Sequence, residues 1–355
     1  MSWLLAFAGF AVLIVLHEAG HFAIAKAVGM RVERFFLFFP PKLVSFRRGE
    51  TEYGIGAVPL GGFVKITGMN PEEELPPEIA RRGYYAQPVW KRIVVIAAGP
   101  ATNALVAFLI LFALAFTVSE LTSNVGRVLP GSPAEGRLQP GDRLIAVDGR
   151  GGDQLALADR IDSHRCPGTP RQGCRAATPA LIAVERNGRV ERLRIRPEFD
   201  AGIGRNRLGF SFATRPSDPG TVEAAGLAGS FMWEISTRTV GVIVRLFDPE
   251  QREQISGVVG GYELTRQAIE FDARRALTLV AVISLSLALI NLFPFLPLDG
   301  GHIFWSLVEK VRGKRVPFRV MERAGAIGFV LILMLFFIGL SNDIGRLTGE
   351  GFGLR

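Results

Sequence analysis

Charged residues are missing from three long stretches of this 355-residue sequence, 93–118, 276–298 and 324–340. A fourth stretch, 3–25, has no ionisable side chain apart from His17, Glu18 and His21. Each stretch is about as long as a helix needs to be to cross ~30 Å of hydrocarbon at ~1.5 Å per residue. A hydrophobic fraction of 48%, concentrated in this way, excludes an ordinary soluble enzyme. We therefore expect four membrane segments.

Two further absences narrow the class of protein. The net charge is +8, but no basic stripe with interleaved aromatic residues is present, so we expect no nucleic-acid partner. The first apolar segment has no basic residues in front of it, and its cleavage would remove His17, Glu18 and His21. We therefore do not interpret it as a signal peptide.

Basic residues gather in two loops, which the positive-inside rule places in the cytoplasm. The amino terminus and the long 119–275 region are then expected on the outer side of the membrane. The loop after the first segment holds Arg31, Arg34, Lys42, Arg47, Arg48, Lys65, Arg81, Arg82, Lys91 and Arg92, and the loop after the third segment holds Lys310, Arg312, Lys314, Arg315 and Arg319.

The first membrane segment contains the motif His17-Glu18-Ala19-Gly20-His21. Residues i and i+4 share a helix face, so both imidazoles can reach one Zn²⁺. Glu18, next to the first ligand, can then take the proton of a zinc-bound water. The alternative is a buried polar cluster that neighbouring helices satisfy, but ionisable groups in a membrane segment are costly and usually functional.

A second polar group follows the third segment, in the stretch from Asn291 to His302. A catalytic zinc takes three protein ligands and leaves one position open for water. Asp299 would complete the set of His17 and His21. His302 is the rival third ligand, or a group that orients one. Three of the four histidines lie in these two motifs, and the fourth is His164, which favours a dedicated metal centre.

The stretch before Asp299 is expected to handle the substrate. Pro294 and Pro297, with the glycines that follow, predict a break in the helix. Asn291 is a candidate for donating to a substrate carbonyl or for holding an extended strand, and the alternative is a hydrogen bond to the broken backbone. We assign Asn291, Pro294 and Pro297 to substrate binding.

Between the first two membrane segments, residues 31–70 contain short strand-like runs broken by Gly and Pro, which predict a hairpin. We place it beside the metal, where a free edge could pair with an extended peptide, and assign Gly54 and Gly56 to substrate binding. An ordinary cytoplasmic hairpin is an equal alternative. In the second membrane segment, Asn103 needs a polar partner and is a candidate active-site residue, whereas Gly99 is interpreted as helix packing.

Residues 124–213 resemble a PDZ domain, because a strand and a Gly131-Ser132-Pro133-Ala134 turn precede Leu138-Gln139-Pro140-Gly141-Asp142. Its 207–210 stretch resembles a loop that binds a carboxylate terminus, so peptide binding is possible there, with a plain strand as the alternative. Cys166 and Cys174 share one loop of this region, where a disulfide or two free thiols are favoured over a metal site.

These features predict a polytopic α-helical membrane protein with about four transmembrane helices, a membrane-associated β-hairpin or sheet and an inserted PDZ-like α+β domain. The segment 221–275 has a helical period of apolar residues and predicts amphipathic helices at the membrane surface or packed on the PDZ-like domain. The predicted parts are 1–118 (spans at 3–27 and 93–118, hairpin at 31–70), 124–213, 221–275 and 276–355 (spans at 276–298 and 324–341).

Together these motifs resemble a bacterial site-2 protease of the M50 family, the zinc intramembrane proteases that cut membrane-spanning anti-sigma factors. The resemblance covers nearly the whole chain and implies that Glu18 is the base and that His17, His21 and Asp299 bind one Zn²⁺. It also implies an inner-membrane location and a transmembrane substrate trimmed beforehand by another protease, with the PDZ domain excluding untrimmed substrates and the removal of signal-peptide remnants as a second role. Enterobacterial members carry two tandem PDZ domains, and this sequence has one.

Two other functions remain alternatives at this point. A non-catalytic membrane scaffold would use the PDZ-like domain to recruit partners and would not need Glu18. A metal or ion transporter would use His17, His21 and Asp299 in its path, but the PDZ-like domain and the adjacent Glu18 argue against it.

Overall fold

The computed structural model describes residues 2–70, 72–244 and 257–349. The chain divides into two compact units, Met1–Ala115 with Gly220–Arg355, and Phe116–Pro219. We call the first the membrane unit and the second the inserted unit. Residues 245–256 of the predicted surface-helix segment, and residues 350–355 at the end of the last predicted part, lie outside the described residues.

Among the residues that the structure describes, four helices of the membrane unit are long and apolar enough to cross a membrane: α1 (Ser2–Ala27), α3 (Val89–Ala115), α8 (Ala273–Asn291) and α10 (Phe318–Thr348). The third of them ends earlier than the predicted span, which runs to Leu298. Residues 292–298 form a non-helical connector instead, since Pro294 and Pro297 have no N–H to donate to a continuing helix.

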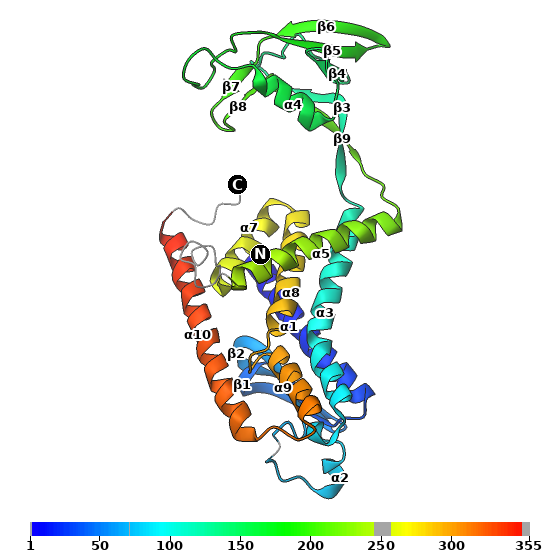
Figure 1. The fold of residues 1–355 in the computed structure, drawn as a ribbon, viewed down its shortest axis with the longest axis vertical. Coiled ribbons are helices and arrows are strands. Elements are labelled where there is room, and N and C mark those ends of the chain that lie inside the picture. The colour runs from blue at the N-terminus through cyan, green and yellow to red at the C-terminus, as the bar shows by residue number, and fades with distance from the viewer. Residues whose placement is uncertain (1, 71, 245–256, 350–355) are drawn as a thin grey trace. The chain divides into compact units, whose positions relative to one another are not determined.

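Helix α3 packs against α1, α8 and α9 (Asp299–Arg312) (Figure 1). It approaches α1 closely at Gly20, where an added Cβ would lie 2.4 Å from Thr102 Oγ1 and 2.5 Å from the Ala98 carbonyl oxygen. A residue without a side chain is therefore required inside the H-E-x-x-H motif. Close backbone approach of this kind is how helices associate in lipid, where burial of apolar surface supplies little driving force.

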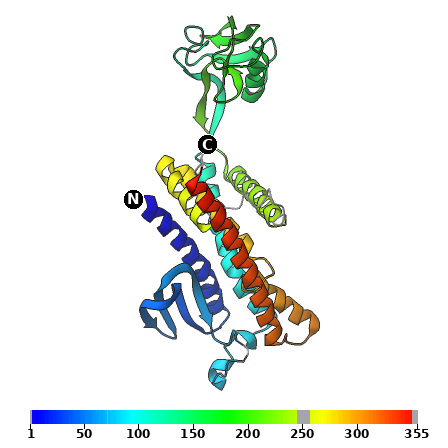
Figure 2. The same cartoon turned by 90° about the vertical axis from the view of Figure 1, so that its left-hand side faces the viewer.

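The predicted hairpin is present as two long, bent strands, β1 (Val32–Arg48) and β2 (Thr51–Ile66), which pair antiparallel. Residues 34–37 pair with 62–65 on one side and with 52–55 on the other. The 34–37 segment is therefore a central strand of this small sheet, and the 62–66 end of β2 is an edge strand. Both strands contact α1, and Figures 1 and 2 show them beside the half of α1 that leads into β1.

The segment between the hairpin and α3 is rich in Glu and Pro. It contains the short helix α2 (Pro77–Ala80) and the 3₁₀ turn η1 (Tyr84–Ala86). Tyr84 is only 1% exposed and packs with Met30, Val95 and Ile96 in one core cluster. This aromatic side chain therefore anchors the segment against α3, while many of its other residues are exposed.

In the described part of the region predicted to be amphipathic lie the helices α5 (Thr221–Val244) and α7 (Val258–Phe271). Helix α5 packs on α3 and α8, and α7 packs on α1, α8 and α10. Asp343 on α10 accepts hydrogen bonds from the amides of Gly257 and Gly260 at the start of α7, with distances of 3.1 and 2.7 Å. This interaction joins the last helix to the helix that precedes α8.

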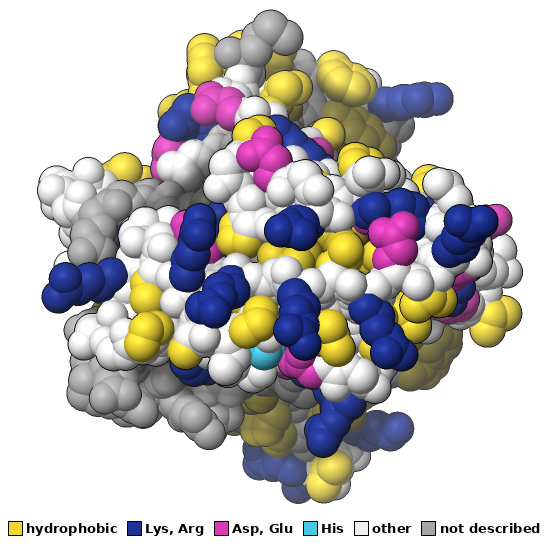
Figure 3. All heavy atoms as spheres, turned by 90° about the horizontal axis from the view of Figure 1, so that it is seen from above, with side chains coloured by type: hydrophobic (Ala, Val, Ile, Leu, Met, Phe, Trp, Pro, Cys, Tyr) yellow, Lys and Arg dark blue, Asp and Glu magenta, His cyan; other side chains and the backbone are white. Residues whose placement is uncertain are grey.

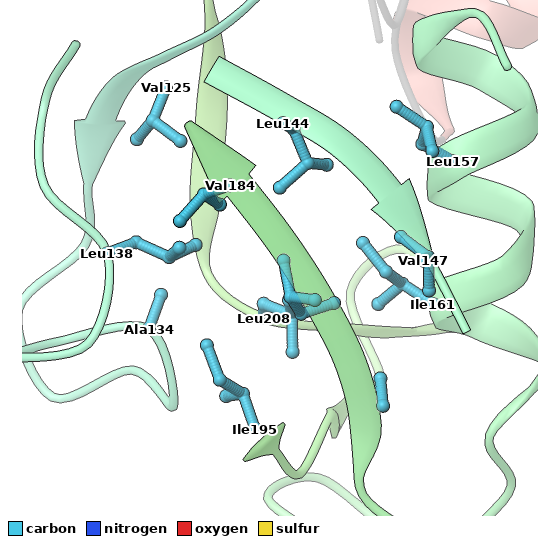
Figure 4. Packing of buried hydrophobic residues seen from close by; sticks show 12 residues of the cluster. Val125, Ala134, Leu138, Leu144, Val147, Leu157, Ile161, Val184, Ile195 and Leu208 are labelled. Atoms are coloured by element: carbon cyan, nitrogen blue, oxygen red, sulfur yellow. The ribbon is translucent and has the colours of Figure 1, made fainter. Parts of the chain in front are cut away.

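The inserted unit is a five-stranded sheet in the order β6-β5-β4-β3-β9, with one helix, α4 (Gln154–Ser163). Its strands are β3 (Ser119–Val128), β4 (Arg143–Val147), β5 (Ala180–Arg186), β6 (Arg189–Ile195) and β9 (Phe210–Pro216), and a separate pair is formed by β7 (Glu198–Asp200) and β8 (Arg205–Arg207). Alternate residues of these strands point into one core, where Val125, Leu144 and Val184 belong to the same cluster as Leu157 and Ile161 of α4, and Val147 lies beside Ile161 (Figure 4).

All basic residues of the inserted unit are arginines, and one of them makes a buried ion pair. Arg186 donates from Nε and from a terminal nitrogen to the two oxygens of Asp142, each at 2.7 Å, and Asp142 is 3% exposed. Most other charged groups lie on the surface, and Figure 3 shows a face on which Lys and Arg side chains alternate with isolated hydrophobic ones.

We predict that Asp142→Asn destabilises the inserted unit by about 2 kcal/mol, because the change removes the two charged hydrogen bonds to Asp142 and leaves Arg186 with the more exposed Glu191 as its anionic partner. The Arg186 guanidinium holds the pKa of Asp142 below its ordinary value. Its stabilising effect is therefore complete above about pH 4 and is lost as the pH falls through the folded-state pKa. Hydrogen exchange of the 116–219 amides in the full chain measures both effects. The matched control is Glu185→Gln, which breaks an exposed pair with Arg143 and should cost less than about 1 kcal/mol.

Candidate metal centre

The structure brings together the three residues predicted to bind the metal. His17 Nε2 and His21 Nε2 lie 3.2 and 3.3 Å from Asp299 Oδ2 and 3.3 Å from each other. Both histidines are 7% exposed and their rings meet edge to face. Helix α1 presents the two imidazoles one turn apart, and α9 presents Asp299 at its first residue. Residues 282 positions apart in sequence thus form one small cluster.

The spacing of the three atoms fits a zinc ion. Zinc bonds to imidazole nitrogen and carboxylate oxygen are ~2.0–2.2 Å long, so two ligand atoms of a tetrahedral site lie about 3.3 Å apart. The three atoms form a nearly equilateral triangle of that size, which leaves a fourth tetrahedral position open. Asp299 Oδ2 is also buried and has no hydrogen-bond donor among the described residues. A buried oxygen in this situation requires a cation or an unrecorded donor.

The outer nitrogens of both histidines have partners that fix the rings. His21 Nδ1 lies 2.9 Å from the carbonyl oxygen of Val95, so this nitrogen carries the hydrogen and Nε2 keeps its lone pair for a metal. His17 Nδ1 lies 3.3 Å from the side-chain amide of Asn103, which is fully buried. If a metal binds His17 Nε2, Nδ1 carries the hydrogen, and the amide oxygen of Asn103 must accept it. This orientation interchanges the oxygen and nitrogen of the Asn103 amide, two atoms that are nearly indistinguishable. Asn103 is therefore placed to fix the orientation of the His17 ring.

Gly99 is part of the site, although the sequence pattern suggested only helix packing. An added Cβ at Gly99 would lie 2.3 Å from His21 Nε2 and 2.9 Å from His17 Cε1. The two imidazoles thus occupy the space beside the α3 backbone that any side chain would fill. The Gly-Pro pair in a membrane helix was the available signal, but sequence alone does not show which helix faces Gly99.

Glu18 lies on α1 beside the three ligands, and its carboxylate interacts electrostatically with His17, His21 and Asp299. The 62–66 end of β2, at the edge of the hairpin, also lies close to Glu18. A Cβ added to Gly62 would lie 2.9 Å from Glu18 Cγ and 3.1 Å from Ile14 Cγ2. Gly62, which the sequence reasoning did not single out, therefore lets β2 pass next to the acid.

Several predicted site residues lie outside the ligand cluster. His302 follows Asp299 by one helical turn and lines a small cavity with Tyr84 and Arg92. Of the two proposed third ligands, Asp299 is the one within reach of both imidazoles. Asn291 donates its side-chain amide to the Leu287 carbonyl at 3.1 Å, which matches the alternative of a bond to the backbone.

The remaining predicted residues have local roles. Pro294 and Pro297 are exposed in the connector between α8 and α9. Gly54 and Gly56 lie on β2 where added Cβ atoms would come within 2.6 Å of the Phe36 ring and 2.2 Å of the Phe39 carbonyl oxygen. These glycines allow strands to cross closely, and the structure shows no contact of theirs with the three ligands. Cys166 and Cys174 form a disulfide in the inserted unit.

Comparison with known sequences identifies the family. The model of peptidase family M50 matches residues 5–335. The chain belongs to peptidase family M50. It is 30% identical over 370 residues to the zinc metalloprotease Rip1 of Mycobacterium tuberculosis (strain H37Rv), covering 94% of this chain and 91% of Rip1. It is 31% identical over 366 residues to a candidate zinc metalloprotease of Rhizobium meliloti, covering 95% of this chain and 94% of that protein.

Membership of the M50 family establishes several predictions at once. The protein is a zinc metalloprotease with Zn²⁺ as its cofactor, and it crosses the membrane several times. The family acts on membrane-embedded substrates. The comparisons therefore favour the enzyme over the scaffold and the transporter, which were the alternatives from sequence.

Proposed function

We propose that this M50 peptidase is an intramembrane endopeptidase that cuts the transmembrane segment of single-pass membrane proteins. In this proposal His17, His21 and Asp299 hold the zinc, and Glu18 is the general base. One observation carries it: three ligand atoms 3.2–3.3 Å apart converge inside a bundle of membrane-length helices, with a carboxylate next to them.

The mechanism follows from the chemistry of these residues. Bound zinc supplies a Lewis acid that lowers the pKa of a coordinated water toward ~7 and polarises the scissile carbonyl. Glu18 takes the proton from the attacking water and then passes it to the leaving amide nitrogen. The Val95 carbonyl and Asn103 keep the ligand nitrogens of His21 and His17 unprotonated. The low polarity of the surroundings strengthens each of these interactions.

The hairpin is the proposed holder of the substrate. A transmembrane helix must unwind before its carbonyls can react, and an extended segment then needs new backbone partners. The 62–66 end of β2 runs beside Glu18, where a peptide could pair with it as an added strand. Gly54, Gly56, Asn291, Pro294 and Pro297 are assigned to this substrate path. Asn291 would have to exchange its bond to the Leu287 carbonyl for one to the substrate.

The finer biological role is also a proposal. We assign the inserted unit to the PDZ-like class on the outer side of a bacterial inner membrane, with the metal centre toward the cytoplasm, because basic residues cluster in the loops on that side. The proposed substrate is an anti-sigma factor already trimmed by another protease, or a signal-peptide remnant. The inserted unit would exclude untrimmed substrates or bind a new chain end.

We expect the purified protein in lipid nanodiscs to cut a single-span peptide with Gly and Pro near the middle of its span. A zinc chelator should stop cleavage, Zn²⁺ should restore it, and a non-chelating isomer of the chelator should have no effect. The matched substrate has Leu in place of Gly and Pro, and it should be cut at least about tenfold more slowly, because its helix resists unwinding. Mass spectrometry locates the cut. Cleavage only outside the span would contradict the proposal.

A further inference from the structure

A buried ion pair joins α9, which carries Asp299, to α3, which contacts both imidazoles of the metal centre. Arg92 of α3 donates to Glu309 of α9 through both terminal nitrogens, at 2.9 and 2.8 Å to the two carboxylate oxygens. Arg92 is 2% exposed, and its guanidinium lies 5.9 and 5.3 Å from the ring centroids of Tyr84 and Tyr85. Two parallel hydrogen bonds of this kind fix both distance and orientation, which a single contact does not.

Each partner is tied to a zinc ligand through its own helix. Val95, one turn after Arg92 on α3, accepts the hydrogen of His21 Nδ1. Asp299 is the first residue of α9, and Glu309 lies on the same helix near its other end. Figure 1 shows α9 alongside α3, and α3 is the main element against which α9 packs. The ion pair therefore links the helix that orients His21 to the helix that presents Asp299.

The first turn of α9 is held by close backbone contacts. Added Cβ atoms would lie 2.2 Å from the Leu292 carbonyl oxygen at Gly300 and 2.5 Å from the Leu296 nitrogen at Gly301. These contacts set where α9 begins. Apolar packing against α3 is less directional than a polar contact, because lipid tails solvate the same side chains equally well. The ion pair at the far end of α9 adds a directional restraint on the rotation of this helix.

We propose that Arg92 and Glu309 are positioning residues for the metal centre, which fix the rotation and height of α9 and so hold Asp299 against the two imidazoles. This inference rests on the proposed ligand set of His17, His21 and Asp299. It concerns zinc affinity, on which the pair would act through the helices α3 and α9.

Competition with a fluorescent zinc chelator, on the full chain in nanodiscs, tests the pair. We expect Glu309→Gln and Arg92→Lys each to weaken zinc binding by about 10- to 100-fold, the usual effect of removing a group that orients a ligand. The reversed pair, Arg92→Glu with Glu309→Arg, should bind zinc within about threefold of the original protein because it restores the two-point contact. The control is Glu263→Gln, which breaks an ion pair with Arg266 on α7 and should leave the affinity unchanged.

The thermal midpoint of the metal-free protein separates positioning from stability. A merely structural pair would lower this midpoint and leave the zinc affinity of the folded protein within threefold, and that result would overturn the inference. So would a reversed pair as weak as the single variants. If Glu309→Gln does not fold, Arg92→Lys is used for the test, since lysine keeps the positive charge and cannot make the two parallel hydrogen bonds of the guanidinium. Asp299→Ala is measured in parallel. Retained zinc in that variant would refute the ligand set itself, separately from the role of the pair.

Discussion

Glu18→Gln abolishes cleavage of a membrane-spanning substrate while the protein still binds one zinc ion: this is the result we expect. The amide keeps the shape of the side chain and cannot accept the proton of the attacking water. General-base catalysis contributes on the order of 10²–10⁴ in rate, and this base also serves as the acid for the leaving nitrogen. We therefore expect a loss of about 10³-fold or more, measured as cleavage in nanodiscs beside zinc content by elemental analysis.

The control is Glu322→Gln, which changes an exposed acid near the start of α10 and should leave the rate unchanged. Retained cleavage in Glu18→Gln would refute the mechanism. Loss of both cleavage and zinc would assign Glu18 to the integrity of the metal centre and not to proton transfer. A scaffold or a transporter would show no cleavage in either form of the protein.

Gly99→Ala is predicted to remove zinc from the folded protein. One methyl group would lie 2.3 Å from His21 Nε2 and 2.9 Å from His17 Cε1, well inside contact distance. The imidazoles cannot retreat without losing the Val95 carbonyl or Asn103. We expect the zinc affinity to fall by on the order of 100-fold or more, since both ligands move together. Chelator competition gives the affinity, and cleavage at saturating zinc gives the residual activity.

Helix propensity makes this substitution informative. Ala is favoured over Gly inside a helix by ~1 kcal/mol, so α3 itself should not be weakened. The matched control is Gly9→Ala on α1, where an added Cβ meets no atom within 4 Å. This variant should retain both zinc and activity. A Gly99→Ala protein with unchanged zinc affinity would show that the imidazoles bind the metal in other positions than those described here.

The part of the site that sequence predicted is the part with a fixed local spacing. His17 and His21 must share a face because four residues separate them on a helix, and Glu18 follows from its place in the motif. Asp299 could be selected because acids are rare in membrane-length stretches. The choice between Asp299 and His302 was less secure from sequence, since both begin the same helix and only its rotation decides which of them faces α1.

The residues that sequence did not identify are far from the ligands along the chain and come close to them only in the folded structure. Gly99, Gly62 and the Val95 carbonyl matter because α3 and β2 happen to pass within contact distance of α1. Arg92 was counted with the cytoplasmic basic residues, because the charge pattern does not show that Glu309, far along the chain, lies opposite it. The early end of α8 has a similar origin, since apolar composition continues to Leu298 whereas the helix does not.

The inserted unit joins the rest of the chain through one paired stem. Val118 and Ser217 share a backbone hydrogen bond, and Ser119 lies opposite Pro216 as β3 leaves and β9 returns. The chain thus enters and exits the insertion at neighbouring points, as it does at a simple hairpin turn. Such a junction tolerates exchange of everything beyond it, so evolution could duplicate, replace or shorten this module while the hydrolytic machinery kept its geometry.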